Sequence, residues 1–448
     1  MRDSPRAPVT LRDLTRFFLP LIFTTELTQI SHSIINAVLA RQETPKVVLA
    51  AFAVAVAIQQ SIGSPQWCAP QVCISFIEDK RSLWRLAGFF LLVSVPPGLI
   101  MLALALTPAG DFYFGVLLGA SAEVIGQAKL ATLVLTATLL FVLLRSLTFG
   151  LIMVNRRTLL ITYSSAVRVA SLIGFLVVLP HFMPGAVAGA VALTGCIATE
   201  GFFVAWVGRH FYRALPARKG PPATLGEMWL FSWPLMMAHT AENAVGFIIN
   251  LFLGRLASPD LALAAFGVVN GLVRVVLSPL RNLAQTAQTL VRSREELRTM
   301  LRFATRVTLV FAALVAVAFM TPLRRVFLQD VMGLRDELSA YSEPAVMLTV
   351  LVALFWGYAA TFRGLLSGVR RTKPIGASSA LRLTLITGIS SATLLVPGSN
   401  GAVVGVLAIA GAFVGETALL GWTLLLRRRN PALALFPAEQ PAEGPAGR

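Results

Sequence analysis

The sequence predicts an all-α polytopic membrane protein with twelve transmembrane helices, arranged as two parallel six-helix bundles. Three observations support this fold class. First, 56% of the 448 residues are hydrophobic and only 13% are charged, whereas soluble domains carry about 25% charged residues. Second, the sequence contains a long internal repeat. Third, the basic residues are concentrated in alternate loops.

Apolar runs of roughly 20 residues, long enough to cross a bilayer, place the transmembrane helices. In the first half they lie at about 17–39, 47–76, 86–107, 129–153, 158–180 and 185–208. In the second half they lie at about 228–253, 261–290, 303–320, 344–368, 375–396 and 401–426. An even number of spans in each half leaves the two halves in the same orientation, so the repeat is parallel.

The repeat is visible residue by residue. At one constant offset, and after two residues of slippage near its end, the matches include Pro20 with Pro234, Asn36 with Asn250, Arg168 with Arg382 and Glu200 with Glu416. A repeat this long is a duplicated half-molecule, a common origin of transporters. We predict a bundle at 1–212, a cytoplasmic linker at 213–223, a second bundle at 224–429 and a disordered tail at 430–448.

The distribution of lysine and arginine predicts the orientation in the membrane. The strongly basic loops all fall on one side, at about 2–16, 80–85, 156–157, 209–219, 292–302, 370–373 and 427–429. Because cytoplasmic loops are enriched in basic residues, we expect a protein of the cytoplasmic (inner) membrane with both termini in the cytoplasm. The net charge of +17 then reflects topology, so we expect a lipid bilayer and no nucleic acid as partner.

The sequence carries no catalytic or metal-binding signature. It has no HExxH, GxSxG, Walker or CxxC motif, and only three cysteines and four histidines. We therefore predict no enzyme activity, no cofactor and no metal site. The informative residues are polar groups inside the spans, which are costly against lipid and must face protein or water.

Two repeat-related pairs of charges lie at similar depths in the fifth and sixth spans and in their copies. They are Arg168 with Glu200, and Arg382 with Glu416. Their duplication favours structural ion pairs, and a role in binding substrate or protons remains the alternative.

The first and seventh spans each carry a polar stripe. Thr25, Gln29, His32 and Asn36 recur at helical spacing, and the equivalent positions hold His239, Asn243, Gly246 and Asn250. Two such stripes facing each other would line a central cavity, with Glu26, Glu242 and His239 as candidates for proton coupling, because a carboxyl group removed from water binds a proton more readily. The alternative is that these residues only join neighbouring helices.

The eighth span breaks the symmetry of the repeat. Arg274 and Arg281 stand where the second span has Gln60 and Trp67. Two intramembrane arginines two turns apart predict a cavity that attracts anions, because the guanidinium group suits carboxylate and phosphate. Pairing with Glu26 or Glu242, and snorkelling to the interface, are the alternatives. The predicted substrate-binding residues are Arg274, Arg281, His32, Asn36, Asn243, Asn250 and Gln60.

Twelve spans as a parallel duplication, with Pro20 opening the first span and L-A-A-F opening the second at 49–52, resemble the multidrug/oligosaccharidyl-lipid/polysaccharide flippase superfamily. The stretches P-L-I-F-T-T-E-L-T-Q-I-S-H-S-I-I-N at 20–36 and I-S-F-I-E-D-K-R-S at 74–82 look most like the progressive ankylosis protein family. The superfamily resemblance implies a V-shaped pair of bundles that works by alternating access. The closer resemblance implies export of small anions such as pyrophosphate, citrate or nucleoside phosphates.

The sequence thus predicts a monomeric secondary transporter that exports a small organic or phosphate-bearing anion, coupled to protons or sodium. Its rivals are a multidrug cation antiporter, a flippase for lipid-linked glycans, and a membrane-embedded enzyme or scaffold. An antiporter for cations requires acidic residues to dominate the cavity, whereas the flippase requires a lateral opening.

Overall fold

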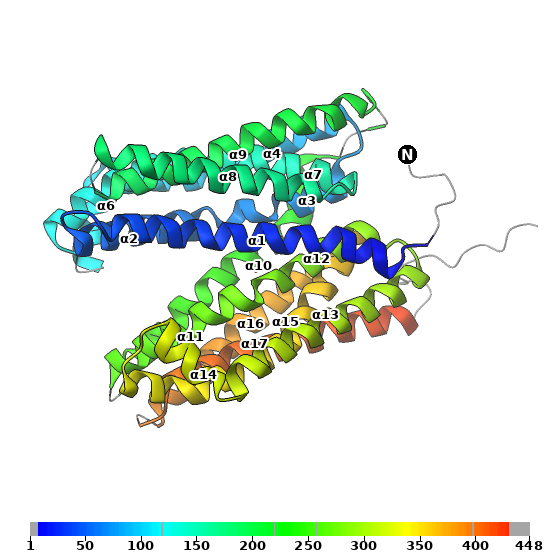
Figure 1. Ribbon diagram of the computed structural model, residues 1–448. Coiled ribbons are helices and arrows are strands. Elements are labelled where there is room, and N and C mark those ends of the chain that lie inside the picture. The colour runs from blue at the N-terminus through cyan, green and yellow to red at the C-terminus, as the bar shows by residue number, and fades with distance from the viewer. Residues whose placement is uncertain are drawn as a thin grey trace, which may run out of the picture.

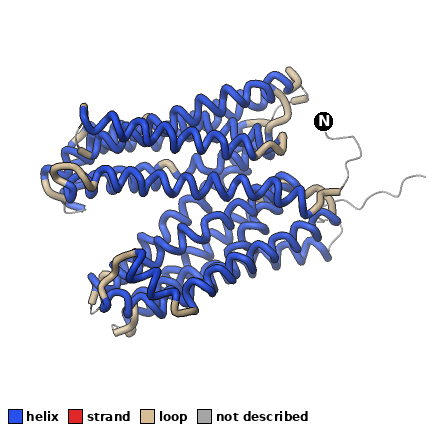
Figure 2. The backbone as a smooth tube through the Cα atoms, in the orientation of Figure 1, coloured by secondary structure: helices blue, strands red, loops and turns tan. Residues whose placement is uncertain are grey.

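The computed structural model describes residues 8–429, except 118, 119, 184, 219, 222, 257 and 397. The described part of the chain is helical, with short connecting loops and no strand (Figure 2). The predicted tail at 430–448 lies outside the described residues.

The first half contains α1 to α9. Its elements are α1 (Leu11–Leu39), α2 (Pro45–Ile62), η1 (Ser64–Cys68), α3 (Ala69–Phe76), α4 (Lys80–Leu106), α5 (Pro108–Asp111), η2 (Phe112–Leu117), α6 (Ala122–Thr136), α7 (Thr138–Val154), α8 (Leu159–Val178), η3 (Leu179–His181) and α9 (Ala186–Ala214).

The second half repeats this order. Its elements are α10 (Leu225–Leu253), α11 (Pro259–Leu277), η4 (Ser278–Arg281), α12 (Asn282–Leu290), α13 (Arg294–Met320), α14 (Leu323–Arg325), η5 (Val326–Val331), α15 (Asp336–Gly368), α16 (Lys373–Ser391), η6 (Ala392–Leu394) and α17 (Gly401–Arg429).

Nine helical segments in the described part of the chain are long and apolar enough to cross a membrane. Three further helices, α1, α10 and α16, have 29, 29 and 19 residues. At 1.5 Å per residue, these lengths suffice for a span. Two of these helices, α1 and α10, carry the predicted polar stripes and are therefore less uniformly apolar than the nine segments above. Together they make the twelve transmembrane helices that the sequence predicts.

The second and eighth spans are interrupted where the sequence has proline. The 3₁₀ turn η1 contains Pro65 and separates α2 from α3, while η4 contains Pro279 and separates α11 from α12. A proline within a helix removes one hydrogen bond and crowds the preceding turn. The same break in both halves therefore follows from the sequence.

Helix starts at one end of the molecule are capped alike in the two halves. Thr10 and Asp13 form a capping box at the start of α1, and Thr224 and Glu227 form the equivalent box at α10. Reciprocal bonds of this kind satisfy amide groups that a helix start leaves free. The loops at this end, at about 77–79, 155–158, 215–224, 291–293 and 369–372, belong to the predicted basic side, and we call it the basic end.

Exposed tryptophans mark the level of a membrane interface near the basic end. Of the seven tryptophans in the chain, five are well exposed and lie within about two turns of a helix terminus there: Trp84, Trp206, Trp229, Trp233 and Trp422. Tryptophan is enriched where hydrocarbon meets head groups.

The two bundles lie closest together at the basic end, near the N-terminus in Figure 1, and their helices diverge toward the opposite end. Cross-bundle hydrogen bonds explain this arrangement. Asn282 Nδ2 donates to the Leu21 carbonyl oxygen at 3.0 Å and to Thr25 Oγ1 at 2.9 Å. Gln288 Nε2 donates to the Gln71 carbonyl oxygen at 2.6 Å and to Ser75 Oγ at 3.0 Å.

Candidate functional site

A carboxylate at the centre of the second bundle binds two arginines from neighbouring helices. Glu416 on α17 is fully buried and accepts from Arg363 on α15, with Nε–Oε1 and Nη2–Oε2 distances of 2.5 and 2.9 Å. Arg382 on α16 donates to Oε2 of the same carboxylate. The bidentate bond to Arg363 is the geometry in which guanidinium and carboxylate interact most strongly.

A second carboxylate, Glu242 on α10, extends this group of charges. Arg281 Nη2 in η4 lies 2.6 Å from Glu242 Oε1, and Arg363 Nη1 lies 4.0 Å from Glu242 Oε2. Arg363 thus stands between the two carboxylates and connects them. The pairing of Arg281 with Glu242 is one of the alternatives that the sequence leaves open.

Arg274 on α11 is the cation of this group that stays without a salt bridge. Its side chain makes no hydrogen bond or ion pair with any residue that the structure describes. It lines a cavity of about 50 Å³ together with Asn270, Glu242, Arg281 and Arg382. That volume holds one or two water molecules, so the cavity is a small polar recess within the bundle.

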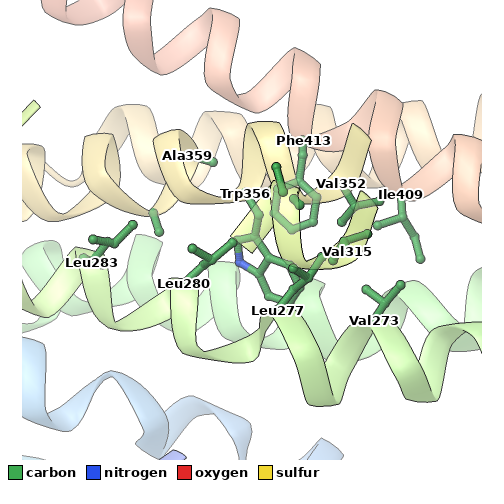
Figure 3. Close-up of a cluster of buried hydrophobic side chains, with 14 of the residues drawn as sticks. Val273, Leu277, Leu280, Leu283, Val315, Val352, Trp356, Ala359, Ile409 and Phe413 are labelled. Carbon is green, nitrogen blue, oxygen red and sulfur yellow. The ribbon is translucent and has the colours of Figure 1, made fainter. Parts of the chain in front are cut away.

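An apolar wall supports the recess. Trp356 stacks on Phe413 with ring centroids 4.9 Å apart, and both line the cavity beside Val273 and Ile409. Figure 3 shows these side chains gathered between α11, α15 and α17. Apolar surroundings strengthen electrostatic interactions in the recess, because they lower the local dielectric constant.

The charge cluster, which comprises residues Glu242, Arg274, Arg281, Arg363, Arg382 and Glu416, has four arginines and two glutamates. It therefore carries two positive charges in excess. An anion entering the recess would find Arg274 available, whereas each of the two carboxylates in the cluster already has an arginine partner.

The first bundle holds a simpler version of the same arrangement. Glu200 on α9 accepts from Arg145 Nη1 on α7 at 3.0 Å and from Ser165 Oγ at 3.0 Å, and Arg168 Nη1 on α8 lies 3.7 Å away. All three partners come from the first bundle, so this group joins α7, α8 and α9.

Sequence analysis did not single out Arg145 or Arg363. By the offset of the repeat, Arg145 corresponds to Ala359 and Arg363 to Phe149, so the two arginines occupy different turns of equivalent helices. The repeat therefore gives no sign of them. The available signal was that any arginine in an apolar span needs a partner.

The polar stripes on α1 and α10 meet different surroundings. On α10, Glu242 enters the charge cluster, His239 packs edge-on against Trp67 and Asn243 donates to the His239 carbonyl oxygen. On α1, Glu26 is half-buried, and no described residue lies within hydrogen-bonding or ion-pairing distance of its carboxylate.

The other predicted ligands are not brought into the recess. His32 and Gln60 are half-buried, while Asn36 and Asn250 are exposed, and none of these four lines the recess. Of the predicted substrate-binding residues, the structure brings only Arg274 and Arg281 together there. The roles of the other five remain predictions.

The fold and site define a polytopic helical protein of two repeat-related bundles, with a charged recess in the second. Solved structures share this fold. A eukaryotic MATE transporter, AtDTX14, superposes with a TM-score of 0.75 at 17% identity, over 93% of this chain and 95% of that chain. A MOP superfamily transporter from Pyrococcus furiosus gives 0.74 at 15%, over 94% and 96%. An outward-facing multidrug resistance MATE family transporter gives 0.71 at 15%, over 95% and 96%.

The family model MatE matches residues 234–392, a region within the second half of the chain. No curated protein matches the sequence. The chain therefore has the fold of MATE transporters of the MOP superfamily, in agreement with the broader resemblance seen in the sequence. The closer resemblance to the progressive ankylosis family stays a prediction.

Proposed function

We propose that this protein is a MATE-type secondary transporter, which moves small organic molecules across a membrane by alternating access. The observation that supports it most is the shared fold: the chain superposes along 95% of its length on an outward-facing multidrug resistance transporter. The bundles of this chain are joined at one end and diverge at the other (Figure 1). Neither the recess nor the rest of the described chain contains a group of His, Cys, Asp or Glu residues suited to a metal ion.

The contacts at the basic end suit a reversible closure. Asn282 and Gln288 join the bundles through neutral hydrogen bonds, each worth about 1 kcal/mol net. The buried ion pairs, in contrast, lie within one bundle each. Arg370 also crosses between the bundles, because it donates to the Ser75 carbonyl oxygen and lies 3.5 Å from the exposed Glu78. Closing the opposite end would break these cross-bundle contacts and keep the buried ion pairs inside each bundle.

The proposal includes the predicted topology and coupling. Because the basic end would face the cytoplasm, this conformation would open to the outside. Glu26 is the preferred site for a coupling proton, because its carboxylate has no partner among the described residues. The domain limits, the inner-membrane location and the monomeric state belong to the same proposal.

Drug-like organic compounds are the first substrate class to test. The solved structures that share the fold include a multidrug resistance transporter, which favours the multidrug hypothesis over anion export. In this chain, Glu26 is the residue that would attract a cationic drug, since the carboxylates of the charge cluster are already paired.

Organic anions are the second candidate, because one specific observation favours them. Arg274 has no salt bridge, and its recess carries excess positive charge. The transporter from Pyrococcus furiosus is described as having a reversed polarity of its binding pocket, which suggests a different function for it. The recess has room for only one carboxylate or phosphate group of a citrate-, pyrophosphate- or nucleotide-like anion. That group would pair with Arg274 and compete with Glu242 for Arg281.

Transport by the purified protein in proteoliposomes separates the two classes. Uptake of ethidium, citrate, pyrophosphate and ATP is measured for the unchanged protein, for Glu26→Gln and for Arg274→Gln, each of which removes one unpaired charge. A multidrug antiporter is supported if ethidium transport is lost in Glu26→Gln but not in Arg274→Gln. An anion exporter is supported if anion transport is lost in Arg274→Gln but not in Glu26→Gln. Absence of transport for every compound, by protein that remains folded, would contradict both.

A further inference from the structure

Two large pockets lie at the basic end, and the internal repeat relates them. The N-pocket, of about 810 Å³, is lined by the start of α1, the loop before α8 and the end of α9. The C-pocket, of about 680 Å³, is lined by the start of α10 and the loop before α16, and also by the loop between α3 and α4 and part of the linker before α10. Arg156 and Arg157 of the N-pocket correspond by the repeat to Arg370 and Arg371 of the C-pocket.

The two pockets differ in charge. The N-pocket holds Arg16, Arg156, Arg157 and His210 against one acid, Asp13. With His210 neutral, its excess is two positive charges. The C-pocket holds three basic residues and three acids, and is neutral: Arg370, Arg371, Lys373, Glu78, Asp79 and Glu227.

The acid in the N-pocket is already occupied. The Asp13 carboxylate accepts from the Thr10 hydroxyl at 2.7 Å and from the Thr10 amide at 3.0 Å. The hydrogen bond from the Thr10 side chain lowers the pKa of Asp13. In the C-pocket, by contrast, a basic residue already has partners. Arg370 donates to the Ser75 carbonyl oxygen and pairs with Glu78. Of the two pockets, only the N-pocket thus carries net positive charge, and its Arg16 and Arg157 are exposed.

Apolar side chains continue from the N-pocket toward the membrane core. Leu19 and Phe23 on α1 are 46% and 54% exposed, and Leu159 and Tyr163 on α8 are 52% and 55% exposed. The members of each pair are one helical turn apart, and both helices run from the basic end into the membrane. These surfaces need an apolar partner, and acyl chains supply one.

The depth of the N-pocket agrees with a head-group site. Trp206, exposed on α9, precedes His210 by one turn and marks the interface. Guanidinium groups bind phosphate through paired hydrogen bonds, and clusters of basic residues at this depth bind anionic lipids.

We propose that the N-pocket binds the phosphate-bearing head group of an anionic phospholipid from the leaflet at the basic end. Arg16 and Arg157 contact the head group, and the acyl chains lie along the exposed residues of α1 and α8. The C-pocket does not bind such a lipid. The site is separate from the recess beside Arg274, because the two share no lining residue.

The test uses the full-length protein in nanodiscs that contain equal amounts of phosphatidylglycerol and phosphatidylcholine, followed by native mass spectrometry of the retained lipid. The unchanged protein should retain phosphatidylglycerol preferentially. Each basic residue near an anionic surface contributes about 1 kcal/mol, and a factor of ten corresponds to about 1.4 kcal/mol. Arg16→Gln/Arg157→Gln should therefore weaken this preference about 30-fold, and Arg157→Gln alone about fivefold.

The matched control is Arg371→Gln/Lys373→Gln, which removes two charges from the C-pocket and should keep the preference. Size-exclusion profiles check that all variants are folded. Equal preference in the unchanged protein and the N-pocket variant would overturn the proposal. It would also be overturned if glycerol 3-phosphate raised the thermal unfolding midpoint as much as long-chain phosphatidylglycerol, since the ligand would then be a soluble phosphate compound.

Discussion

Glu416→Gln is expected to destabilise the second bundle more than any other single change within the charge cluster. The carboxylate neutralises Arg363 and Arg382, whose side chains are 10% and 2% exposed. Glutamine retains the shape of glutamate but removes the charge, so two buried guanidinium groups would lose the carboxylate that they share. Removing one partner of a buried ion pair costs about 3–5 kcal/mol.

The expected loss lies near the lower end of that range. Arg363 keeps a weaker partner, because its Nη1 is 4.0 Å from Glu242, whereas Arg382 keeps none of comparable strength. The thermal unfolding midpoint of the purified protein in detergent measures the effect. Glu200→Gln is the matched control in the first bundle, and it should lower the midpoint less because Arg145 is 20% exposed and Arg168 lies 3.7 Å from the carboxylate.

A double variant tests the electrostatic reasoning directly. Arg382→Met added to Glu416→Gln removes one of the uncompensated charges and should restore part of the lost stability, with a coupling of about 0.5–3 kcal/mol. The reasoning is refuted if Glu416→Gln unfolds at the temperature of the unchanged protein. It is also refuted if the double variant is less stable than Glu416→Gln alone.

Three further predictions concern packing, gating and coupling. Gly405→Ala should lower the free energy of unfolding by about 1–3 kcal/mol, because a Cβ there would overlap the ring of Phe266. The control Gly388→Ala places a Cβ that meets nothing within 4 Å and should leave the unfolding midpoint unchanged or higher. Equal effects of the two variants on the midpoint would argue against the observed packing. Gln288→Ala removes two cross-bundle hydrogen bonds and should weaken closure of the basic end by about 1–3 kcal/mol. Spin labels on the two bundles should then report a shift in the distances between the bundle tips. An unchanged distance distribution would contradict this prediction. Glu26→Gln should abolish dependence of transport on a proton gradient while keeping the unfolding midpoint, and a variant that still responds to the gradient would exclude Glu26 as the coupling residue.

The fold could be predicted because its determinants are local or repeated. Apolar runs place the spans, and the strongly basic loops alternate with loops that carry few basic residues. The second and eighth spans break at Pro65 and Pro279, which the repeat matches. Each of these signals depends on composition along the chain. None requires knowledge of how one helix is rotated against another.

The site could be predicted only in part, because it does depend on rotation. Depth along the helices does not show whether Arg274 or Arg281 pairs with Glu242. In the structure Arg281 makes the pair, and Arg281 lies in the 3₁₀ turn η4, where the regular helical spacing is interrupted. Arg363 joins two carboxylates that lie far apart in the sequence. Its place depends on the packing of α10, α15 and α17, which no span-by-span pattern contains.

A comparison of the two halves leads to a hypothesis about which charges serve the scaffold and which serve the site. Glu200 and Glu416 are repeat-related, and each binds arginines from its own bundle, as a scaffold requires in both halves. Glu242, Arg274 and Arg281 stand where the first half has Thr28, Gln60 and Trp67. A duplicated fold does not need these charges to pack its helices, because the first bundle forms without them. We therefore propose that their role lies in what the second bundle alone does, and the recess beside Arg274 is where that proposal can be tested.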